Sequence, residues 1–150
     1  MLTIPHPVWN QIIRHAEQGY PNETCGLLVG SKNEKTASHY YPCRNIYDEM
    51  HARHPETYPR TARTAYLMDP AQQQKIFDGA TAQELEIKGI MHSHTDHEAY
   101  FSEEDSLVAA PWGEPMIPGV SYIVVSVSKG KFQEMKEYCW DESKKLFVQN

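Results

Sequence analysis

The chain has 150 residues, of which 40% are hydrophobic and 23% are charged, and its formal net charge is -6. This size and composition fit one globular domain and exclude collagen-like, low-complexity and wholly disordered chains. No apolar run approaches the roughly 18 residues of a membrane-spanning helix, and no basic cluster offers the patch that nucleic-acid binders use. We therefore expect one soluble domain over residues 1–150, with neither nucleic acid nor membrane as its partner.

The N-terminal segment and the cysteines indicate a cytoplasmic protein. Residues 1–7 lack the basic start and the apolar stretch of a signal peptide. Cys25, Cys43 and Cys139 are an odd number without C-x-x-C spacing, so they form neither a complete disulfide framework nor a four-thiolate zinc site. We predict that all three thiols are reduced and buried.

The first half of the chain predicts one helix, two paired strands and a long loop. Residues 7–18 begin with a proline and carry apolar residues at helical spacing until Gly19 ends the pattern. The apolar run 25–30 predicts a buried strand, and residues 35–43 predict its antiparallel neighbour. Residues 44–65 are polar, contain prolines and show no period, which predicts a long loop or flap.

The second half predicts two helices and four strands, so the whole chain is of the α+β class, with helices against a largely antiparallel sheet. Asp69 is a helix cap and precedes a proline, which predicts a helix over 70–85. A third, short helix begins at about residue 103 and ends before Pro111, where a loop begins. Strands are expected at residues 87–94, 120–128, 131–140 and 145–148.

A group of histidines and acids follows the third predicted strand. His92 and His94 are two residues apart, so an extended strand projects both imidazoles to the same side. Asp105, on the next predicted helix, can add a carboxylate to them. Two histidines and one carboxylate leave a fourth position for water, which is the arrangement of catalytic rather than structural zinc.

The complete pattern resembles the JAMM (MPN+) metallopeptidases. It consists of H-S-H, seven further residues and S-x-x-D, with an upstream glutamate beside an apolar strand in N-E-T-C-G-L-L-V-G. The order of the predicted elements also fits that family, and the chain is most similar to its small stand-alone forms from bacteria and archaea. The resemblance implies a single-domain MPN-type sandwich, in which helices flank a largely antiparallel mixed sheet.

The resemblance also implies a role for five residues. His92, His94 and Asp105 would bind zinc (Zn2+). Glu23 would be the general acid/base, and Ser102 would stabilise the oxyanion. Zinc lowers the pKa of bound water to about 7, and a nearby carboxylate can take its proton and return it to the leaving amine.

The substrates of characterised family members give the leading hypothesis for function. These members remove groups attached to the C-terminal Gly-Gly of ubiquitin-like proteins, including sulfur-carrier proteins. We therefore expect a zinc metallopeptidase or isopeptidase acting on the C-terminal tail of a ubiquitin-like or sulfur-carrier protein. The tail could add as a strand to an exposed sheet edge, with residues 44–65 as a clamp. Tyr100 and Trp112 either line the substrate groove or are apolar staples within their loops.

Other functions and other roles stay open at this point. The alternative functions are a zinc amidohydrolase for small amides or short peptides and a non-catalytic MPN-type binding scaffold, whereas the motifs of nucleoside deaminases are absent. A second copy of the chain, in a homodimer, is a further possible partner. Ser102 and Asp105 also form an S-x-x-D capping box, and a carboxylate turned back to the cap has fewer lone pairs for a metal. Asp96 and His97 are rival ligands, or groups at the rim of the site.

Overall fold

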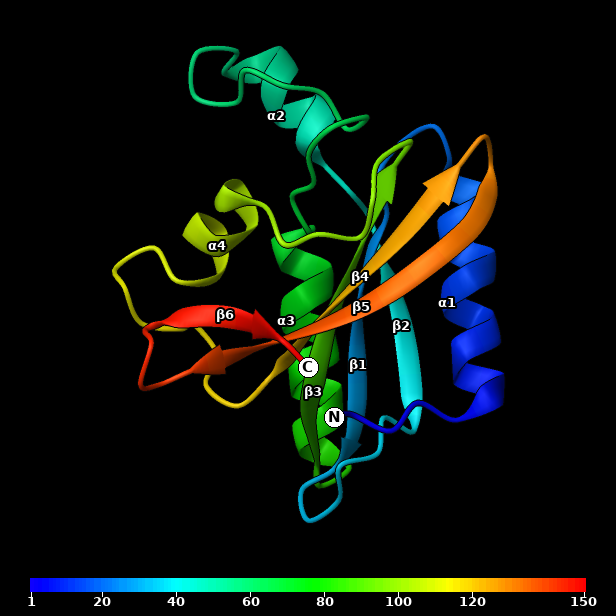
Figure 1. Cartoon of the computed structure of the whole chain (residues 1–150), viewed down its shortest axis with the longest axis vertical. Helices are drawn as coiled ribbons and strands as arrows, with labels where there is room; N and C mark the ends of the chain where they lie inside the picture. The colour runs from blue at the N-terminus through cyan, green and yellow to red at the C-terminus, as the bar shows by residue number, and fades with distance from the viewer.

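A six-stranded sheet in the order β2-β1-β3-β4-β5-β6 forms the centre of the computed structural model, which describes residues 1–150 (Figure 1). All neighbouring strands are antiparallel except β3 and β4, which run parallel. The prediction of an α+β fold with a largely antiparallel mixed sheet is therefore confirmed. The elements in chain order are α1 (His6–Gly19), β1 (Cys25–Ser31), β2 (His39–Cys43), α2 (Tyr47–Arg53), α3 (Pro70–Ala82), β3 (Leu85–Thr95), α4 (Glu103–Ala109), β4 (Ser121–Ser128), β5 (Lys131–Asp141) and β6 (Leu146–Gln149).

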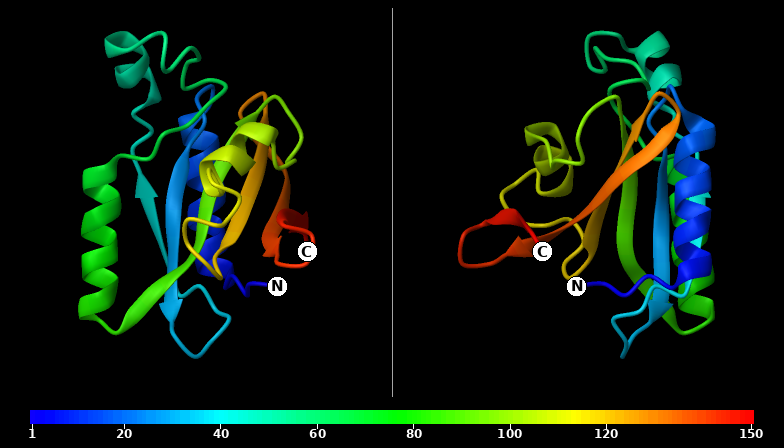
Figure 2. Two further views of the ribbon diagram at one scale, coloured as in Figure 1. Left: turned by 90° about the vertical axis from the view of Figure 1, so that its left-hand side faces the viewer. Right: turned by 45° about the vertical axis from the view of Figure 1, so that its right-hand side comes forward.

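Helices α1 and α3 cover opposite faces of the sheet (Figure 2). Alternate side chains of β1 point to the two faces, as the pleat of a strand requires. Leu27 is buried in the apolar cluster that contains Ala80 of α3. Leu28, the next residue, is buried in the cluster that contains Ile12 of α1. Strand β1 is thus buried on both sides, which explains why its sequence is a continuous apolar run.

The parallel pairing of β3 and β4 determines the path of the chain between them. Parallel neighbours cannot be joined by a tight turn, because the chain must return to the starting end of the sheet. Residues 96–120 make this return, and α4 lies on it. This arrangement carries the side chains of α4 past the C-terminal end of β3.

The prediction of a loop over residues 44–65 is wrong in part, because this segment contains α2. Asp48 and Glu49 lie in the first turn of α2 and Arg53 in its last turn, which suits the helix dipole. None of its residues is buried, so the helix has no apolar face whose spacing a sequence analysis could detect.

Two further boundaries differ from those predicted. Helix α3 ends at Ala82, and Leu85 is the first residue of β3 instead of a residue of the helix. Between them Glu84 has φ 58°, a left-handed conformation that ends the helix.

No helix in the structure has the length and apolar character that crossing a bilayer requires.

None of the three cysteines forms a disulfide. Cys25 and Cys43 are buried, as predicted, whereas Cys139 is only half-buried. Burial raises the pKa of the Cys43 thiol to about 11. These two buried thiols are therefore unreactive parts of the core at neutral pH.

Candidate metal centre

The H-S-H segment forms the C-terminal end of β3, which is paired on both sides. His92 lies opposite Cys25 of β1 and Val124 of β4. His92 and His94 are both buried, and their Nε2 atoms are 3.3 Å apart. The predicted period of two thus brings both imidazoles to one side of an interior strand.

Asp105 of α4 turns its carboxylate toward both imidazoles. Its Oδ1 atom is 3.2 Å from His92 Nε2, and its Oδ2 atom is 3.5 Å from His94 Nε2. One ligand atom from each of the three residues lies within 4.8 Å of the others. A tetrahedral zinc ion with bonds of about 2.0–2.2 Å separates its ligand atoms by roughly 3.4 Å. The donor set and its spacing therefore fit a zinc ion.

Asp105 can complete the helix cap and face the two histidines at the same time. The Asp105 N–H donates to Ser102 Oγ at 3.0 Å, and the Ser102 N–H donates to Asp105 Oδ2 at 2.9 Å, which completes a capping box. The cap uses only Oδ2, so Oδ1 remains free toward His92. The expected competition between capping and ligation does not arise, because the cap orients the carboxylate that faces the histidines.

The hydrogen bond of His94 favours a tautomer that can bind a metal. Its Nδ1 atom is 2.8 Å from the carbonyl of Glu98, so Nδ1–H donates and the neutral ring has its lone pair on Nε2. The ring of His92 is stacked on Tyr66, with centroids 4.5 Å apart and an interplanar angle of 18°. The Nδ1 atom of His92 is buried and has no hydrogen-bond partner, whereas its Nε2 atom faces His94 and Asp105.

The charges within the triad favour an ionised carboxylate. Burial alone would raise the pKa of Asp105, but His92, hydrogen bonds from both histidines and the Ser102 N–H hold that pKa well below its usual range. Burial lowers the pKa of His94, yet its bonds to Asp105 and to the Glu98 carbonyl outweigh this effect and raise it. A metal at this position would therefore replace a proton shared with the carboxylate.

Glu23 precedes β1 and is held beside the triad by its backbone. Its N–H donates to the carbonyl of Ala62 at 2.7 Å, and Asn45 Nδ2 donates to its carbonyl at 2.9 Å. The next residue, Thr24, donates from both its N–H (2.8 Å) and its hydroxyl (3.0 Å) to Ser93 Oγ. Ser93 is the middle residue of H-S-H, so it joins the glutamate segment to the histidine segment.

Glu23 is buried, with only 8% of the residue exposed. Burial raises its pKa to about 8, while the positive charges of His94 and Arg60 act in the opposite direction. The carboxylates of Asp105 and Glu104 add to the increase. A group that titrates near neutrality beside a candidate metal site has the property that general acid/base catalysis requires.

The segment after α2 supports the centre in a way that sequence reasoning missed. The Ala62 carbonyl holds Glu23, and the Arg63 carbonyl accepts a hydrogen bond from the hydroxyl of Thr95 at 2.7 Å. Tyr66 then covers the ring of His92. Two of these three contacts use backbone carbonyls, which leave no signal in the residue types. Thr95, next to His94, is the one polar side chain in these contacts whose residue type could have indicated them in the sequence.

Four other predicted residues lie outside the triad. Asp96 is exposed and accepts hydrogen bonds from a tyrosine hydroxyl and a backbone N–H instead of joining the ligands. His97 is exposed as well. The ring of Tyr100 packs edge-on against His94 at 4.8 Å, whereas Trp112 is 80% exposed. Of these residues, only Tyr100 therefore contacts a candidate ligand.

Replacing Ser93 with alanine should lower the free energy of unfolding by about 1–3 kcal/mol, because both donors of Thr24 would stay buried without their acceptor. Urea denaturation measures this loss. Ser106→Ala is the matched control, since the Ser106 hydroxyl makes no hydrogen bond in the structure. An equal stability of the two variants would contradict the assigned role of Ser93.

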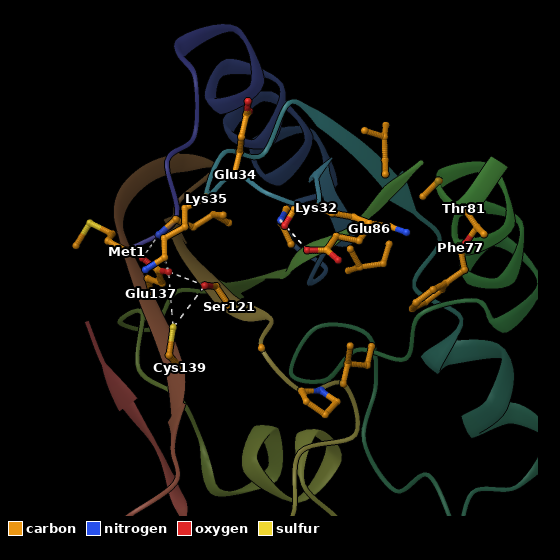
Figure 3. Close-up of a pocket in the computed structure, with 18 residues that line it drawn as sticks. Met1, Lys32, Glu34, Lys35, Phe77, Thr81, Glu86, Ser121, Glu137 and Cys139 are labelled. Atoms are coloured by element: carbon orange, nitrogen blue, oxygen red, sulfur yellow. Dashed lines mark hydrogen bonds and ion pairs between the residues drawn. The ribbon is translucent and has the colours of Figure 1, made fainter. Parts of the chain in front are cut away.

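A cavity of about 510 Å³ lies at the other end of β3 (Figure 3). It is lined by the first residues of β3 and β4 and by the N-terminus, and Glu137 accepts a hydrogen bond from Ser121 at its wall. Ile87, which also lines it, precedes His94 by seven residues, or roughly 23 Å along a strand. The cavity and the candidate centre are thus separate.

Comparisons with known proteins agree with this fold. A family described as prokaryotic homologs of the JAB domain matches residues 5–141. The chain is 28% identical over 139 residues to the CysO-cysteine peptidase of Mycobacterium tuberculosis, covering 92% of this chain and 82% of that relative. It is 27% identical over 143 residues to the desampylase of Haloferax volcanii, covering 93% of this chain and 88% of that relative.

Two solved structures share the arrangement of the elements. A protein from Desulfitobacterium hafniense superposes with a TM-score of 0.71 at 22% identity, covering 100% of this chain and 90% of that one. A JAB1/MPN domain protein from Archaeoglobus fulgidus superposes with a TM-score of 0.54 at 18% identity, covering 98% of this chain and 94% of that one. The MPN-type sandwich expected from the sequence is thereby confirmed.

Proposed function

This chain belongs to the family of prokaryotic homologs of the JAB domain, and from that premise we propose that it is a zinc-dependent peptidase or isopeptidase. Its substrate would be the amide bond after the C-terminal Gly-Gly of a ubiquitin-like or sulfur-carrier protein. The observation that carries the proposal is the His92–His94–Asp105 triad with the buried Glu23 beside it. The names of two relatives, CysO-cysteine peptidase and desampylase, support hydrolysis.

The proposed roles of the residues follow from their positions. Zinc bound by His92, His94 and Asp105 would lower the pKa of its water to about 7 and polarise the amide carbonyl. Glu23 would take a proton from the attacking water and deliver it to the leaving nitrogen as the C–N bond breaks. Its carboxyl group makes no hydrogen bond within the chain, so both of its oxygens are free for this transfer.

Ser102 would donate a hydrogen bond to the developing oxyanion. In the structure its oxygen accepts a hydrogen bond from the Asp105 N–H, and its own hydroxyl hydrogen has no acceptor. The hydroxyl is therefore held in place by the helix cap while its donor remains available. A preorganised donor of this kind contributes about 100- to 1000-fold to a rate.

A Gly-Gly tail suits the surroundings of the two histidines. The aromatic rings of Tyr66 and Tyr100 lie against His92 and His94, with centroids 4.5 and 4.8 Å from them. Glycine has no side chain that would collide with these rings, so its backbone can approach the triad closely. This reasoning favours a glycine tail over a general peptide.

Intact-mass spectrometry tests the proposal directly. A sulfur-carrier protein and a ubiquitin-like protein, each extended beyond Gly-Gly, are incubated with the zinc-loaded enzyme, with and without a zinc chelator. We expect release of the group after Gly-Gly, no release with chelator, and recovery after zinc is restored. Cleavage that persists in chelator would contradict the metal mechanism, and intact carriers with a zinc-loaded enzyme would favour small amides as substrates.

A further inference from the structure

One guanidinium group lies at the rim of the candidate centre without a role in the chemistry proposed above. Arg60 follows α2 and forms an ion pair with Glu104, which immediately precedes Asp105. Its Nη1 atom also donates to a backbone carbonyl of its own segment at 3.1 Å. Two residues further on, Ala62 holds the backbone of Glu23. Arg60 therefore connects the segment that positions the general base with the helix that carries a metal ligand.

The rim around this guanidinium is otherwise acidic. Residues 103–105 are three consecutive acids, and Glu104 and Asp105 are close enough to Glu23 to act on its pKa. The Arg60 charge is close enough to Glu23 to act on the pKa of that carboxyl group. The guanidinium nearest to it in sequence, Arg63, faces Asp96 at 3.9 Å. Among the acids of this rim, Arg60 therefore supplies the attraction that a substrate carboxylate would need.

The two parts of the proposed substrate differ in charge. The Gly-Gly part carries only neutral amide groups, so a cation has no charged partner on that side of the reacting bond. When the leaving part is a single amino acid, its α-carboxylate is one carbon away from the leaving nitrogen. When the leaving part is a lysine side chain of a protein, no carboxylate lies near that nitrogen. A guanidinium close to the base that protonates the leaving nitrogen thus distinguishes these two substrate classes.

The ion pair in the structure shows that this guanidinium can bind a carboxylate at the rim. The side chains of Arg60 and Glu104 are 43% and 54% exposed. An exposed ion pair contributes little to stability, so a substrate carboxylate could take the place of Glu104 at small cost. The planar guanidinium can bind both oxygens of a carboxylate, which gives direction as well as attraction.

We propose that Arg60 binds the α-carboxylate of a single amino acid attached to Gly-Gly, which makes the enzyme selective for carrier–amino acid adducts over isopeptide-linked carriers. The inference deepens the proposed function and rests on it. Arg60 is a specificity-determining residue in this scheme, and Glu104 holds it in place until the substrate arrives.

The test compares two substrates that differ only at the leaving carboxylate. One is a carrier protein extended by one amino acid with a free carboxylate, and the other ends in the corresponding carboxamide. For the wild-type enzyme we expect kcat/KM to be about 10- to 100-fold higher for the free acid, as a charge-assisted hydrogen bond implies. Arg60→Met should lose this preference, because kcat/KM should fall much further for the acid than for the carboxamide.

Two further variants sharpen the result. Arg53→Met removes an exposed arginine of the same segment that has no ion pair, so both substrates should be cleaved as by the wild type. Glu104→Gln removes the competing carboxylate and should lower KM for the acid without changing KM for the carboxamide. Arg60 is exposed, so its substitution should change the melting temperature little. Thermal denaturation of each variant would reveal a folding defect.

Three outcomes would overturn the inference. The wild-type enzyme could cleave the acid and the carboxamide equally, or Arg60→Met could lower both rates to the same extent, which would make Arg60 a positioning residue. An isopeptide-linked carrier could also be cleaved faster than the acid. If the zinc-loaded wild type cleaves none of these substrates, the proposed function itself fails, and the role of Arg60 fails with it.

Discussion

Replacing Glu23 with glutamine should lower kcat by roughly 100- to 10,000-fold, the range that general acid/base catalysis supplies, while the zinc content stays at the wild-type level. Glutamine has the same shape but can neither take the proton from water nor return it to the leaving nitrogen. Glu23 is not one of the three residues whose ligand atoms converge, so the metal should remain bound. The rate is followed by intact mass, and zinc is measured on the same preparation.

A control variant separates the role of Glu23 from a general effect of charge. Glu56→Gln removes an exposed carboxylate that has no ion pair in the structure, from the segment that follows α2. This variant should keep both its activity and its zinc. Turnover by Glu23→Gln at more than about a tenth of the wild-type rate would refute the assignment of Glu23 as the base.

The same variant has a second readout in the metal-free protein. Burial raises the pKa of Glu23 from 4.5 to about 8 in the folded state. The folded protein then holds this proton to a higher pH than the unfolded chain, so Glu23 makes the protein less stable as the pH rises between these two values. Glutamine has no proton to lose, and the loss of stability between about pH 5 and pH 9 should be smaller in Glu23→Gln. Equal losses in urea denaturation would contradict the raised pKa.

The second large effect is expected for His94→Ala, which should abolish both zinc binding and turnover. Removing one of three protein ligands leaves two, fewer than the three protein ligands of catalytic zinc sites. Zinc should raise the melting temperature of the wild type, because it binds only the folded state, but not that of the variant. Elemental analysis and thermal denaturation with and without zinc measure these outcomes.

His97→Ala is the matched control for the second experiment. His97 lies three residues after His94, on the connection that follows β3, but it is exposed and outside the converging ligand atoms. It should retain zinc and activity. Full zinc occupancy in His94→Ala, or loss of zinc in His97→Ala, would show that the ligand set is assigned wrongly.

Much of the fold could be predicted because central strands of the sheet are buried on both faces and its outer strands alternate between exposed and less exposed residues. The buried strands β1 and β4 appear in the sequence as apolar runs. All six predicted strands are present along the chain. Helix α2 escaped detection because none of its residues is buried. The exact end of α3 was missed because it depends on the left-handed conformation of Glu84, which its residue type does not announce.

Only part of the candidate site could be predicted from the spacing of its residues. The spacing of His92 and His94 predicts that they share one side of a strand, and the structure places them so. The position of Glu23 depends on the pairing of β1 with β3, a contact between segments far apart in the chain. Only the resemblance to a family suggested it. The support from the Ala62 carbonyl could not be predicted, because any residue type provides a carbonyl at that position.

The three candidate ligands come from elements of very different robustness. His92 and His94 belong to β3, whose backbone is hydrogen-bonded to a neighbour on each side. Asp105 belongs to α4, a seven-residue helix of which only Ala109 is buried. Local opening reaches such a helix long before it reaches an interior strand. An ion bound by both elements would therefore link α4 to the more stable strand β3. Metal binding would make local opening of α4 rarer and leave the local stability of β3 unchanged.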